Sequence, residues 1–360
     1  MTKFMELMSF YSSYLEEIYG RNPELFGGSY ATQMKALEED AFSGGHLFTS
    51  AMEKHGYESL FAVVNCKQSQ QTWAKEHGMI YGQSTREKII CAQIDHFCPD
   101  VLHIADPVAF NPVFLDNCNW KPRLVVAWRA APIPDDVDWR NVDLMVSTLK
   151  VCRDKAIHSG ARATETFLPA FPEFVAEEVT HIGKKCDVIF AGQIGYLHNK
   201  RQRFLEHLAR VPEFQENKYS LRLHLANWTS MDLSEMEQYI QPTVWGMEMF
   251  RTLKSARIVV NNHIDMADNI ASNMRIFETV GVGSFLLTEQ CHELSEIFEP
   301  GVEVETYNSL SEMEDKIRFY LKHPEKREEI ARKGQERCLK DHGLRKRSEE
   351  LNDLIGKYLL

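Results

Sequence analysis

The sequence alternates between short apolar runs rich in β-branched residues and longer amphipathic stretches, and this alternation continues along most of the chain. Short runs without a polar face are typical of strands buried on both sides of a parallel sheet. The amphipathic stretches between them are typical of crossover helices. The pattern therefore predicts an α/β fold with doubly wound, Rossmann-like parallel sheets.

Two such sets follow one another. In the first, strands are expected at 3–10, 59–64, 100–105, 123–128, 143–148 and 164–169, and helices at 29–40, 45–55, 68–77, 84–98 and 150–159. A proline-containing stretch at 169–182 has no clear period and is interpreted as an interdomain linker. In the second set, strands are expected at 186–192, 220–226, 256–262, 283–289 and 302–307, and helices at 199–210, 246–255, 273–281, 309–322 and 324–340.

The chain is long enough for two domains of ordinary size. We expect one at 1–172 and the other at 173–340, followed by a terminal helix at 341–360. That helix has an apolar face formed by Leu351, Leu354, Ile355 and Tyr358.

The net charge and the cysteines indicate which partners and which cellular compartment to expect. The net charge of −11 disfavours a nucleic-acid partner, because phosphates would be repelled. No apolar run approaches the length of a membrane span, and acidic residues interrupt the N-terminal apolar stretch, so neither a membrane helix nor a signal peptide is expected. The eight cysteines form no CxxC pair and no zinc-type cluster. These features favour a reducing, cytoplasmic location.

The strongest local signal for chemistry lies at 257–289. Here an expected strand runs into a polar loop, and Ser272 or Asn273 caps a short helix. The first turn of a helix that follows a parallel strand offers free backbone N–H groups and a positive dipole end. Arg275 would add a charge-assisted contact to a phosphate. The segment therefore predicts a site for an anion such as a diphosphate.

Glu278 lies three residues after Arg275, so the two side chains share a helix face. Its neighbours are apolar, and a half-buried carboxylate needs a partner. Two interpretations fit this position. Glu278 accepts hydrogen bonds from ribose hydroxyls, as acidic residues do in dinucleotide folds, or it forms an ion pair with Arg275 within the helix.

A second candidate is the junction at 187–208, where a strand leads through glycines to a basic helix start. Gly192 would let the backbone approach a ligand, while Arg201 and His198 would contact a pyrophosphate. The alternative is a solvated helix start. Trp245, before the helix at 246–255, either forms an apolar wall beside a nucleobase or packs in the core.

Candidates in the first domain lie at two loops. Gly44 and Gly45 precede a helix and would bring the backbone near a sugar or acceptor, with His46 as a polar contact; a plain loop is the alternative. Asp106 follows an expected strand, where it would orient or deprotonate an acceptor hydroxyl, or merely cap the next turn. His103, inside that strand, is interpreted as a satisfied core histidine. No P-loop, HExxH, GxSxG, EF-hand or GxGxxG motif is present.

The stretches NMRIFETVGVGSFLLTE (273–289) and ELSEIFEPGVEVETY (293–307) resemble the C-terminal domain of bacterial CgeB-like (spore maturation protein) glycosyltransferases. Those enzymes are relatives of the glycosyltransferase group 1 family and share its two-domain GT-B architecture. DVIFAGQIGYLHNKR (187–201), VWGMEMFRTLKSARIVVNNHID (244–265) and several N-terminal stretches are similar as well. The resemblance covers most of the chain and is most specific at 244–305.

This resemblance implies two Rossmann-like domains facing across a cleft, with the C-terminal helix returning to the N-terminal domain. The C-terminal domain would hold a nucleotide-activated sugar, and the acceptor would approach from the N-terminal one. Gly192 and Arg201 would lie by the diphosphate, Asn273 and Arg275 would begin the phosphate-facing helix, and Glu278 would hold the ribose. His263 and Asp265 would line the sugar end of the cleft, which makes His263 a further catalytic candidate. One departure stands out, since the family's first glutamate, eight positions before Glu278, is Ile270 here.

The expected activity is therefore glycosyl transfer without a bound metal or cofactor. The donor would be UDP-, GDP- or dTDP-linked, and the acceptor a saccharide, a lipid-linked group or a protein. An inverting reaction would need a base, for which Asp106 and His46 are the candidates; in a retaining one the leaving phosphate itself would assist. A GT-B nucleotide-sugar epimerase and a non-catalytic nucleotide- or sugar-binding protein are the alternatives. An NAD dehydrogenase is disfavoured because the glycine fingerprint is missing.

Overall fold

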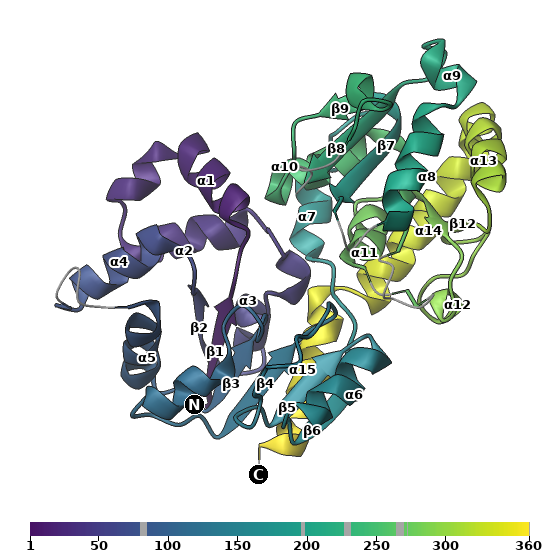
Figure 1. Ribbon diagram of the computed structural model, residues 1–360. Helices are drawn as coiled ribbons and strands as arrows, with labels where there is room; N and C mark the ends of the chain where they lie inside the picture. Colours follow the sequence, from purple (N-terminus) through teal and green to yellow (C-terminus); the bar gives the residue numbers. More distant parts are fainter. Residues whose placement is uncertain (80–84, 196–198, 227–231, 264–269, 272, 360) are drawn as a thin grey trace. The chain divides into compact units, whose positions relative to one another are not determined.

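The computed structural model describes residues 1–79, 85–195, 199–226, 232–263, 270–271 and 273–359. The chain divides into two compact units, Met1–Leu168 with Arg347–Leu360, and Pro169–Lys346. Each unit contains one six-stranded parallel sheet (Figure 1). The predicted α/β class with two Rossmann-like sheets is thus confirmed, while the boundaries at 172 and 340 stay predictions.

The first sheet has the strand order β2-β1-β3-β4-β5-β6. Its strands are β1 (Lys3–Met8), β2 (Glu58–Val63), β3 (Val101–Ile104), β4 (Leu124–Trp128), β5 (Leu144–Ser147) and β6 (Ala163–Thr166). All six overlap the predicted strands. The direction in which strands are added reverses between β1 and β3, so the carboxyl ends of these two strands form the topological switch point of this sheet.

The helices of the first unit include one that the sequence pattern missed, α1. They are α1 (Ser12–Arg21), α2 (Tyr30–Glu39), α3 (Thr49–Glu53), α4 (Lys67–Glu76), α5 (Arg86–Phe97), α6 (Lys150–His158) and the 3₁₀ turns η1 (Pro23–Gly27), η2 (Gly44–His46) and η3 (Pro112–Asn117). The hydroxyls of Ser29 and Thr85 cap α2 and α5, because they accept from the amides of Thr32 and Lys88. The side chain of Asn111 caps η3 in the same way, by accepting from the amide of Val113.

A buried carboxylate organises the centre of the first sheet. Glu6 on β1 accepts from the backbone amides of Phe48 and Thr49 at 2.7 and 3.2 Å and contacts Nδ1 of His103 at 2.7 Å. The carboxylate thus neutralises the N-terminus of α3 and pairs with the neighbouring strand. His103 is fully buried and hydrogen-bonded, which confirms its interpretation as a core histidine.

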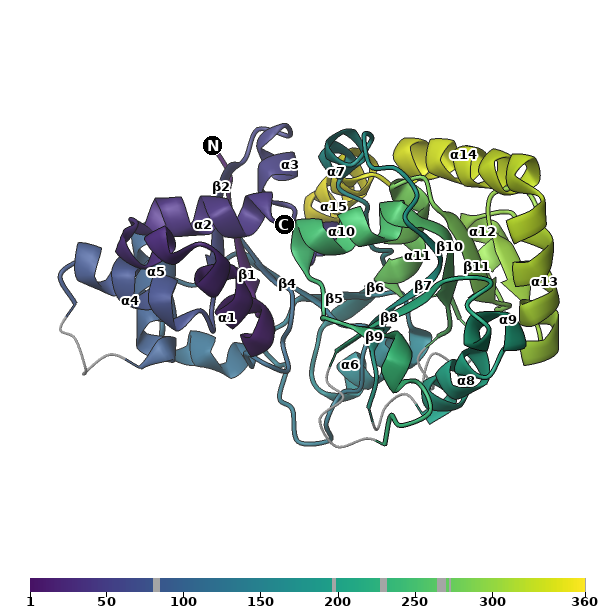
Figure 2. The same cartoon turned by 90° about the horizontal axis from the view of Figure 1, so that it is seen from above.

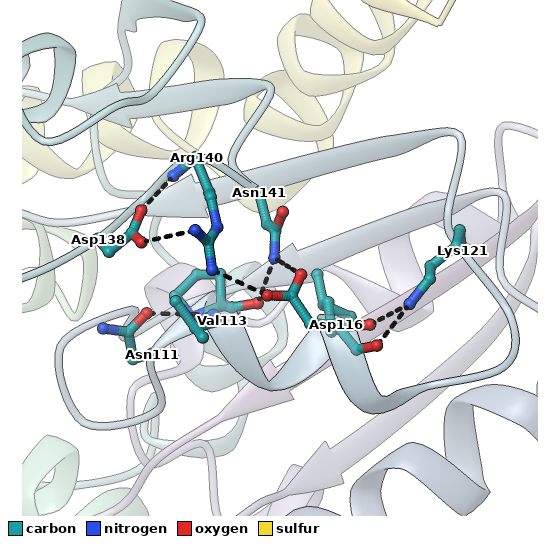
Figure 3. A network of polar contacts seen from close by, with 9 residues as sticks. Asn111, Val113, Asp116, Lys121, Asp138, Arg140 and Asn141 are labelled. Atoms are coloured by element: carbon teal, nitrogen blue, oxygen red, sulfur yellow. Dashed lines mark hydrogen bonds and ion pairs between the residues drawn. The ribbon is translucent and has the colours of Figure 1, made fainter.

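Figure 3 shows the polar network that holds the connection between β3 and β4. Both oxygens of the Asp116 carboxylate are used, since Oδ1 accepts from Asn141 at 2.8 Å and Oδ2 from Arg140 at 3.0 Å. The Lys121 ammonium donates to backbone carbonyls at the end of η3, including that of Cys118 at 2.8 Å. The network ties η3 to the turn before β5.

The second sheet has the strand order β12-β11-β10-β7-β8-β9. Its strands are β7 (Cys186–Gln193), β8 (Leu221–Ala226), β9 (Ile240–Gln241), β10 (Ala256–Asn261), β11 (Phe285–Glu289) and β12 (Glu305–Tyr307). The two-residue β9 was not predicted; the other five overlap the predicted strands. The order reverses between β7 and β10, which is the arrangement of dinucleotide-binding sheets.

Helices cover both faces of this sheet (Figure 2). They are α7 (Glu173–Glu178), α8 (Asn199–Ala209), α9 (Pro212–Gln215), α10 (Gly246–Ser255), α11 (Met274–Gly281), α12 (Leu294–Ile297), α13 (Leu310–Lys322) and α14 (Pro324–Asp341), with the 3₁₀ turn η4 (Glu237–Tyr239). Apolar residues of α8 and α13 form one core with β7, β8, β10 and β11. Helix α7 lies inside the stretch at 169–182 that was interpreted as an interdomain linker, where no helix was predicted.

The last helix, α15 (Leu344–Tyr358), packs on the first unit from Arg347 onward, as predicted. The Tyr57 hydroxyl donates to Asn352 at 3.0 Å, and the Tyr358 hydroxyl donates to Glu165 at 2.8 Å. Leu351 and Ile355 are fully buried. Within the described part of the chain, no helix has the length and apolarity needed to cross a bilayer.

Glu173 caps the start of α15. Its two carboxylate oxygens accept from the amides of Leu344 and Arg345, each at 3.0 Å. Gly343 leaves room for this contact, because a Cβ there would lie 2.2 Å from the carboxylate. We expect Glu173→Ala to lower the free energy of unfolding by about 1–2 kcal/mol, the usual effect of losing an N-cap, measured by urea denaturation.

Glu177→Ala is the matched control, since Glu177 lies on the same short helix and is exposed. Its effect should stay within about 0.5 kcal/mol. Equal losses of unfolding free energy in the two variants would show that the contact of Glu173 with the start of α15 does not stabilise the fold.

Candidate functional site

The carboxyl ends of β7 and β10 lie side by side at the switch point of the second sheet. The two strands pair in parallel, with Ile189 beside Val259. The remaining strands are added on opposite sides of this pair, β8 and β9 beside β7 and β11 and β12 beside β10. In folds of this type, a crevice forms at the carboxyl ends of the central pair. Several residues singled out in the sequence gather here.

Arg201 joins the ends of these two strands. Its guanidinium donates to the Gln193 carbonyl at 2.6 Å, and to the side-chain and backbone oxygens of Asn262 at 2.8 and 3.0 Å. The side chain is only 7% exposed and also lies over the Phe190 ring. A permanent positive charge is therefore held at the switch point, where the sequence analysis expected a diphosphate.

Helix α11 begins at the same place, with Asn273 as its N-cap, as predicted. The Asn273 side chain accepts from the amide of Ile276 at 3.3 Å and donates to Asn261 at 3.1 Å. The first turn is half-exposed. The backbone amides of Met274 and Arg275 have no hydrogen-bond acceptor within the described residues. These amides and the helix dipole together can bind an anion.

Arg275 and Glu278 form an ion pair, with 2.7 Å between Nη1 and Oε2. Arg275 also donates from Nε to the Ala191 carbonyl at 3.0 Å, which ties α11 to β7. Glu278 is 8% exposed, and burial raises the pKa of its carboxyl, while Arg275 opposes that shift. The intrahelical ion pair is thus present. Contacts of Arg275 with phosphate and of Glu278 with ribose stay predictions.

Gly192 and Trp245 are two further candidates from the sequence, and both lie in the second unit. Gly192 lies inside β7, paired with Leu225, and a Cβ there would be 3.1 Å from the Phe190 ring. Trp245 is the buried residue before α10, so its side chain packs in the protein. Their roles toward a ligand stay predictions. His198 and Asp265 lie outside the described residues.

Glu289 is a residue that the sequence analysis missed. It ends β11 next to His263, whose backbone amide donates to its carboxylate at 3.3 Å. His263 is 5% exposed, and burial lowers the pKa of its imidazole despite the nearby carboxylate. A polar residue that ends an expected buried strand is the signal that could have identified Glu289. Ile270, where the sequence resemblance would place a glutamate, pairs with His292 just beyond this strand.

In the first unit, Gly44, Gly45 and His46 form the buried turn η2. The His46 ring is 4% exposed and lies 3.8 Å from the Trp128 ring, centre to centre. Neither ring nitrogen has a hydrogen-bond partner within the described residues. Burial, and to a lesser extent His103, lower the pKa of His46 to about 3. The imidazole is therefore neutral and a weak base in this state.

Asp106 follows β3 at the switch point of the first sheet. One oxygen accepts from Arg129 at 2.8 Å and from the amides of Val108 and Ala109 at 3.2 and 3.1 Å. These contacts are those of a turn cap and an ion pair. The role of Asp106 as a base stays a prediction.

No cluster of three or more His, Cys, Asp or Glu side chains suited to a metal ion occurs within the residues that the structure describes.

Similar proteins are known by fold. HepE of Anabaena, solved with UDP and glucose, has a TM-score of 0.63 at 10% identity over 99% of this chain and 100% of that one. A glycosyltransferase of Rickettsia africae (TM-score 0.59, 9% identity, 99% and 98% coverage) and sucrose-phosphate synthase of Thermosynechococcus elongatus (0.55, 9%, 99% and 99%) are also similar. The chain has the GT-B fold.

Residues 200–353 also match the family model described as glycosyl transferase-like. This segment contains Arg201, Asn273, Arg275, Glu278 and Glu289. No curated protein matches the sequence. The GT-B fold and the family match agree with the architecture and the relationship to glycosyltransferase group 1 that the sequence resemblance implied, while the CgeB-like relationship stays a prediction.

Proposed function

We propose that this GT-B protein transfers a sugar from a nucleotide-activated donor to an acceptor hydroxyl. One observation carries the proposal: Arg201 and the open first turn of α11 meet at the switch point of the second sheet. A buried cation beside free amides suits a diphosphate. The match to glycosyl transferase-like proteins and the UDP-glucose complex of HepE support the same chemistry.

In this proposal the diphosphate leaves with its charge stabilised by the α11 amides and by Arg201, without a metal ion. These donors are in place before the reaction, so no reorganisation is needed as charge develops. Glu278 accepts the ribose hydroxyls while it remains paired with Arg275. The nucleotide is UDP, GDP or dTDP, and the relationship to CgeB-like enzymes and the cytoplasmic location belong to the proposal.

The acceptor is a saccharide, a lipid-linked group or a protein. If the reaction inverts the anomeric centre, Asp106 or His46 takes the hydroxyl proton. In the first case the bound acceptor would have to loosen the contact of Asp106 with Arg129. In the second it would have to reduce the burial effect that lowers the pKa of His46 to about 3, for example by bringing a negative charge close to the ring. If the reaction retains the configuration, the leaving phosphate accepts the proton.

Product analysis separates transfer from the other activities of the fold. UDP-, GDP- and dTDP-glucose are incubated with the protein and water as the acceptor, and the nucleotides are separated by chromatography. Slow release of a nucleoside diphosphate and glucose supports the proposal. Conversion of the sugar without release indicates an epimerase, and binding without turnover indicates a binding protein; either result would contradict transfer.

Calorimetry tests the nucleotide site directly. Glu278→Gln keeps the size of the side chain and removes the charged acceptor, so the affinity for the bound nucleoside diphosphate should fall about tenfold or more, the loss expected for a hydrogen bond to a charged group. Glu336→Gln on α14 is the control, because that carboxylate is paired with Arg332 on the surface. Unchanged affinity in Glu278→Gln would show that Glu278 does not bind the ribose.

A further inference from the structure

The ends of β10 and β11 carry a pair of hydrogen-bond acceptors that the proposed chemistry of the diphosphate does not use. His263 follows β10, and Glu289 is the last residue of β11. The His263 amide donates to the Glu289 carboxylate, and its ring Nε2 lies 3.3 Å from the Glu289 backbone carbonyl. The two residues are therefore held together by their own backbone.

These contacts determine which nitrogen of His263 carries the proton. A backbone carbonyl only accepts, so Nε2 must donate. Burial lowers the pKa of the imidazole, which keeps the ring neutral, and Nδ1 is then an acceptor. Nδ1 is buried and has no partner within the described residues. A buried acceptor without a donor is costly, and a bound ligand that supplies a hydroxyl would satisfy it.

Glu289 is also incompletely used. Its Oε2 has one long contact with the His263 amide, and no partner for Oε1 and no ion pair of the carboxylate occurs within the described residues. The side chain is half-exposed. Glu289 and Nδ1 of His263 thus form a negatively charged pair of acceptors that repels phosphate and favours neutral groups with O–H donors.

The acceptors of His263 and Glu289 lie on the opposite side of the end of β10 from the Arg201 guanidinium. Asn262 is bound to Arg201 on the β7 side, whereas His263 is bound to Glu289 on the β11 side. A donor lying along the carboxyl edge of the sheet would meet positive charge first and acceptors next. That order matches a diphosphate followed by a hydroxylated ring.

We propose that Glu289, with His263, binds hydroxyl groups of the donor's sugar and thereby contributes to the choice of sugar. This inference rests on the proposed function, because it assumes a nucleotide-sugar donor at the second sheet. It identifies Glu289 as a specificity-determining residue, separate from the nucleotide contacts of Glu278.

The test compares nucleotide with nucleotide sugar by calorimetry in the presence of EDTA. UDP, GDP and dTDP and their glucose conjugates are titrated into the wild-type protein, Glu289→Gln and Glu289→Ala, and Glu296→Gln serves as the control. Glu296 is exposed on the neighbouring helix α12. In the Glu289 variants we expect the glucose conjugate to bind about ten- to a hundredfold more weakly and the matching nucleoside diphosphate to bind unchanged.

Several results would overturn the inference. Equal losses of affinity for nucleotide and nucleotide sugar would show that Glu289 belongs to the nucleotide site. No loss of affinity for either would show that Glu289 does not take part in donor binding. A glucose conjugate that binds better than its nucleoside diphosphate only without EDTA would assign the acceptors to a metal ion. If the wild-type protein binds none of the three nucleoside diphosphates, the proposed function fails, and this inference falls with it.

Discussion

Replacing Gly334 with alanine is expected to lower the free energy of unfolding by about 3 kcal/mol. Gly334 lies in the buried part of α14, and a Cβ there would be 2.2 Å from the Glu303 carbonyl oxygen and 3.0 Å from a methyl group of Val280. Because the nearest atom belongs to the backbone, the helix or the 299–304 turn must move. At about 2–4 °C per kcal/mol, the melting temperature should drop by about 6–12 °C.

Gly356→Ala supplies the same chemical change without the clash. Gly356 is an exposed residue of α15, and a Cβ there would meet no atom within 4 Å. Alanine is a better helix former than glycine, so this variant should gain about 0.5–1 kcal/mol. Differential scanning calorimetry of both variants checks the opposite signs. If Gly334→Ala were as stable as the wild type, α14 would not pack this closely against the turn.

Replacing Arg275 with methionine is expected to lower the free energy of unfolding by about 3–5 kcal/mol at neutral pH, because it leaves the buried Glu278 carboxylate without its partner. The double variant Arg275→Met with Glu278→Gln should recover most of this loss, since no buried charge remains. Urea denaturation of the two single variants and the double variant gives the coupling energy between the residues.

The Arg275–Glu278 pair also predicts how the stability of the protein changes with pH. Burial raises the folded-state pKa of Glu278, so the folded protein binds this proton more tightly than the unfolded chain does. The stability linked to this proton is complete below the pKa of the unfolded chain and is lost as the pH rises through the folded-state pKa. Without Arg275 the pKa should rise further. The deficit of Arg275→Met should therefore be larger at pH 8 than at pH 5.

Arg251→Met is the matched control for this experiment. Arg251 and Glu248 form an Arg–Glu pair three residues apart on α10, in the same unit, but both side chains are about half exposed. An exposed pair contributes little, so the loss should stay below about 1 kcal/mol and change little with pH. A similar loss in both arginine variants would mean that burial does not govern the Arg275–Glu278 pair.

The secondary structure was largely predictable because the central strands of both sheets are almost fully buried. Such strands are mainly apolar, and the sequence shows this directly in stretches such as 124–128 and 285–287. The elements that were missed lack that pattern. Helix α7 is six residues long and follows two prolines, and β9 has only two residues, so neither has enough length to show a period.

The candidate site was predictable only where local rules apply. The cap of α11 was narrowed to Ser272 or Asn273 because capping depends on residues within one turn, and the structure has Asn273 as the N-cap. Its contact with Asn261 depends on strand packing. His46 looked like an accessible loop residue, yet the structure buries it against Trp128, eighty-two positions away along the chain.

The amino-acid sequence alone determined the α/β class, two successive parallel sheets and the cap of α11, since burial on both faces and capping act over a few neighbouring residues. Only the tertiary structure decided the strand order, and hence that the switch point lies between β7 and β10. It likewise decided that Arg201 reaches Asn262 and that Glu289 meets His263. Those contacts join distant parts of the chain, and strand pairing, which local composition does not encode, brings them together.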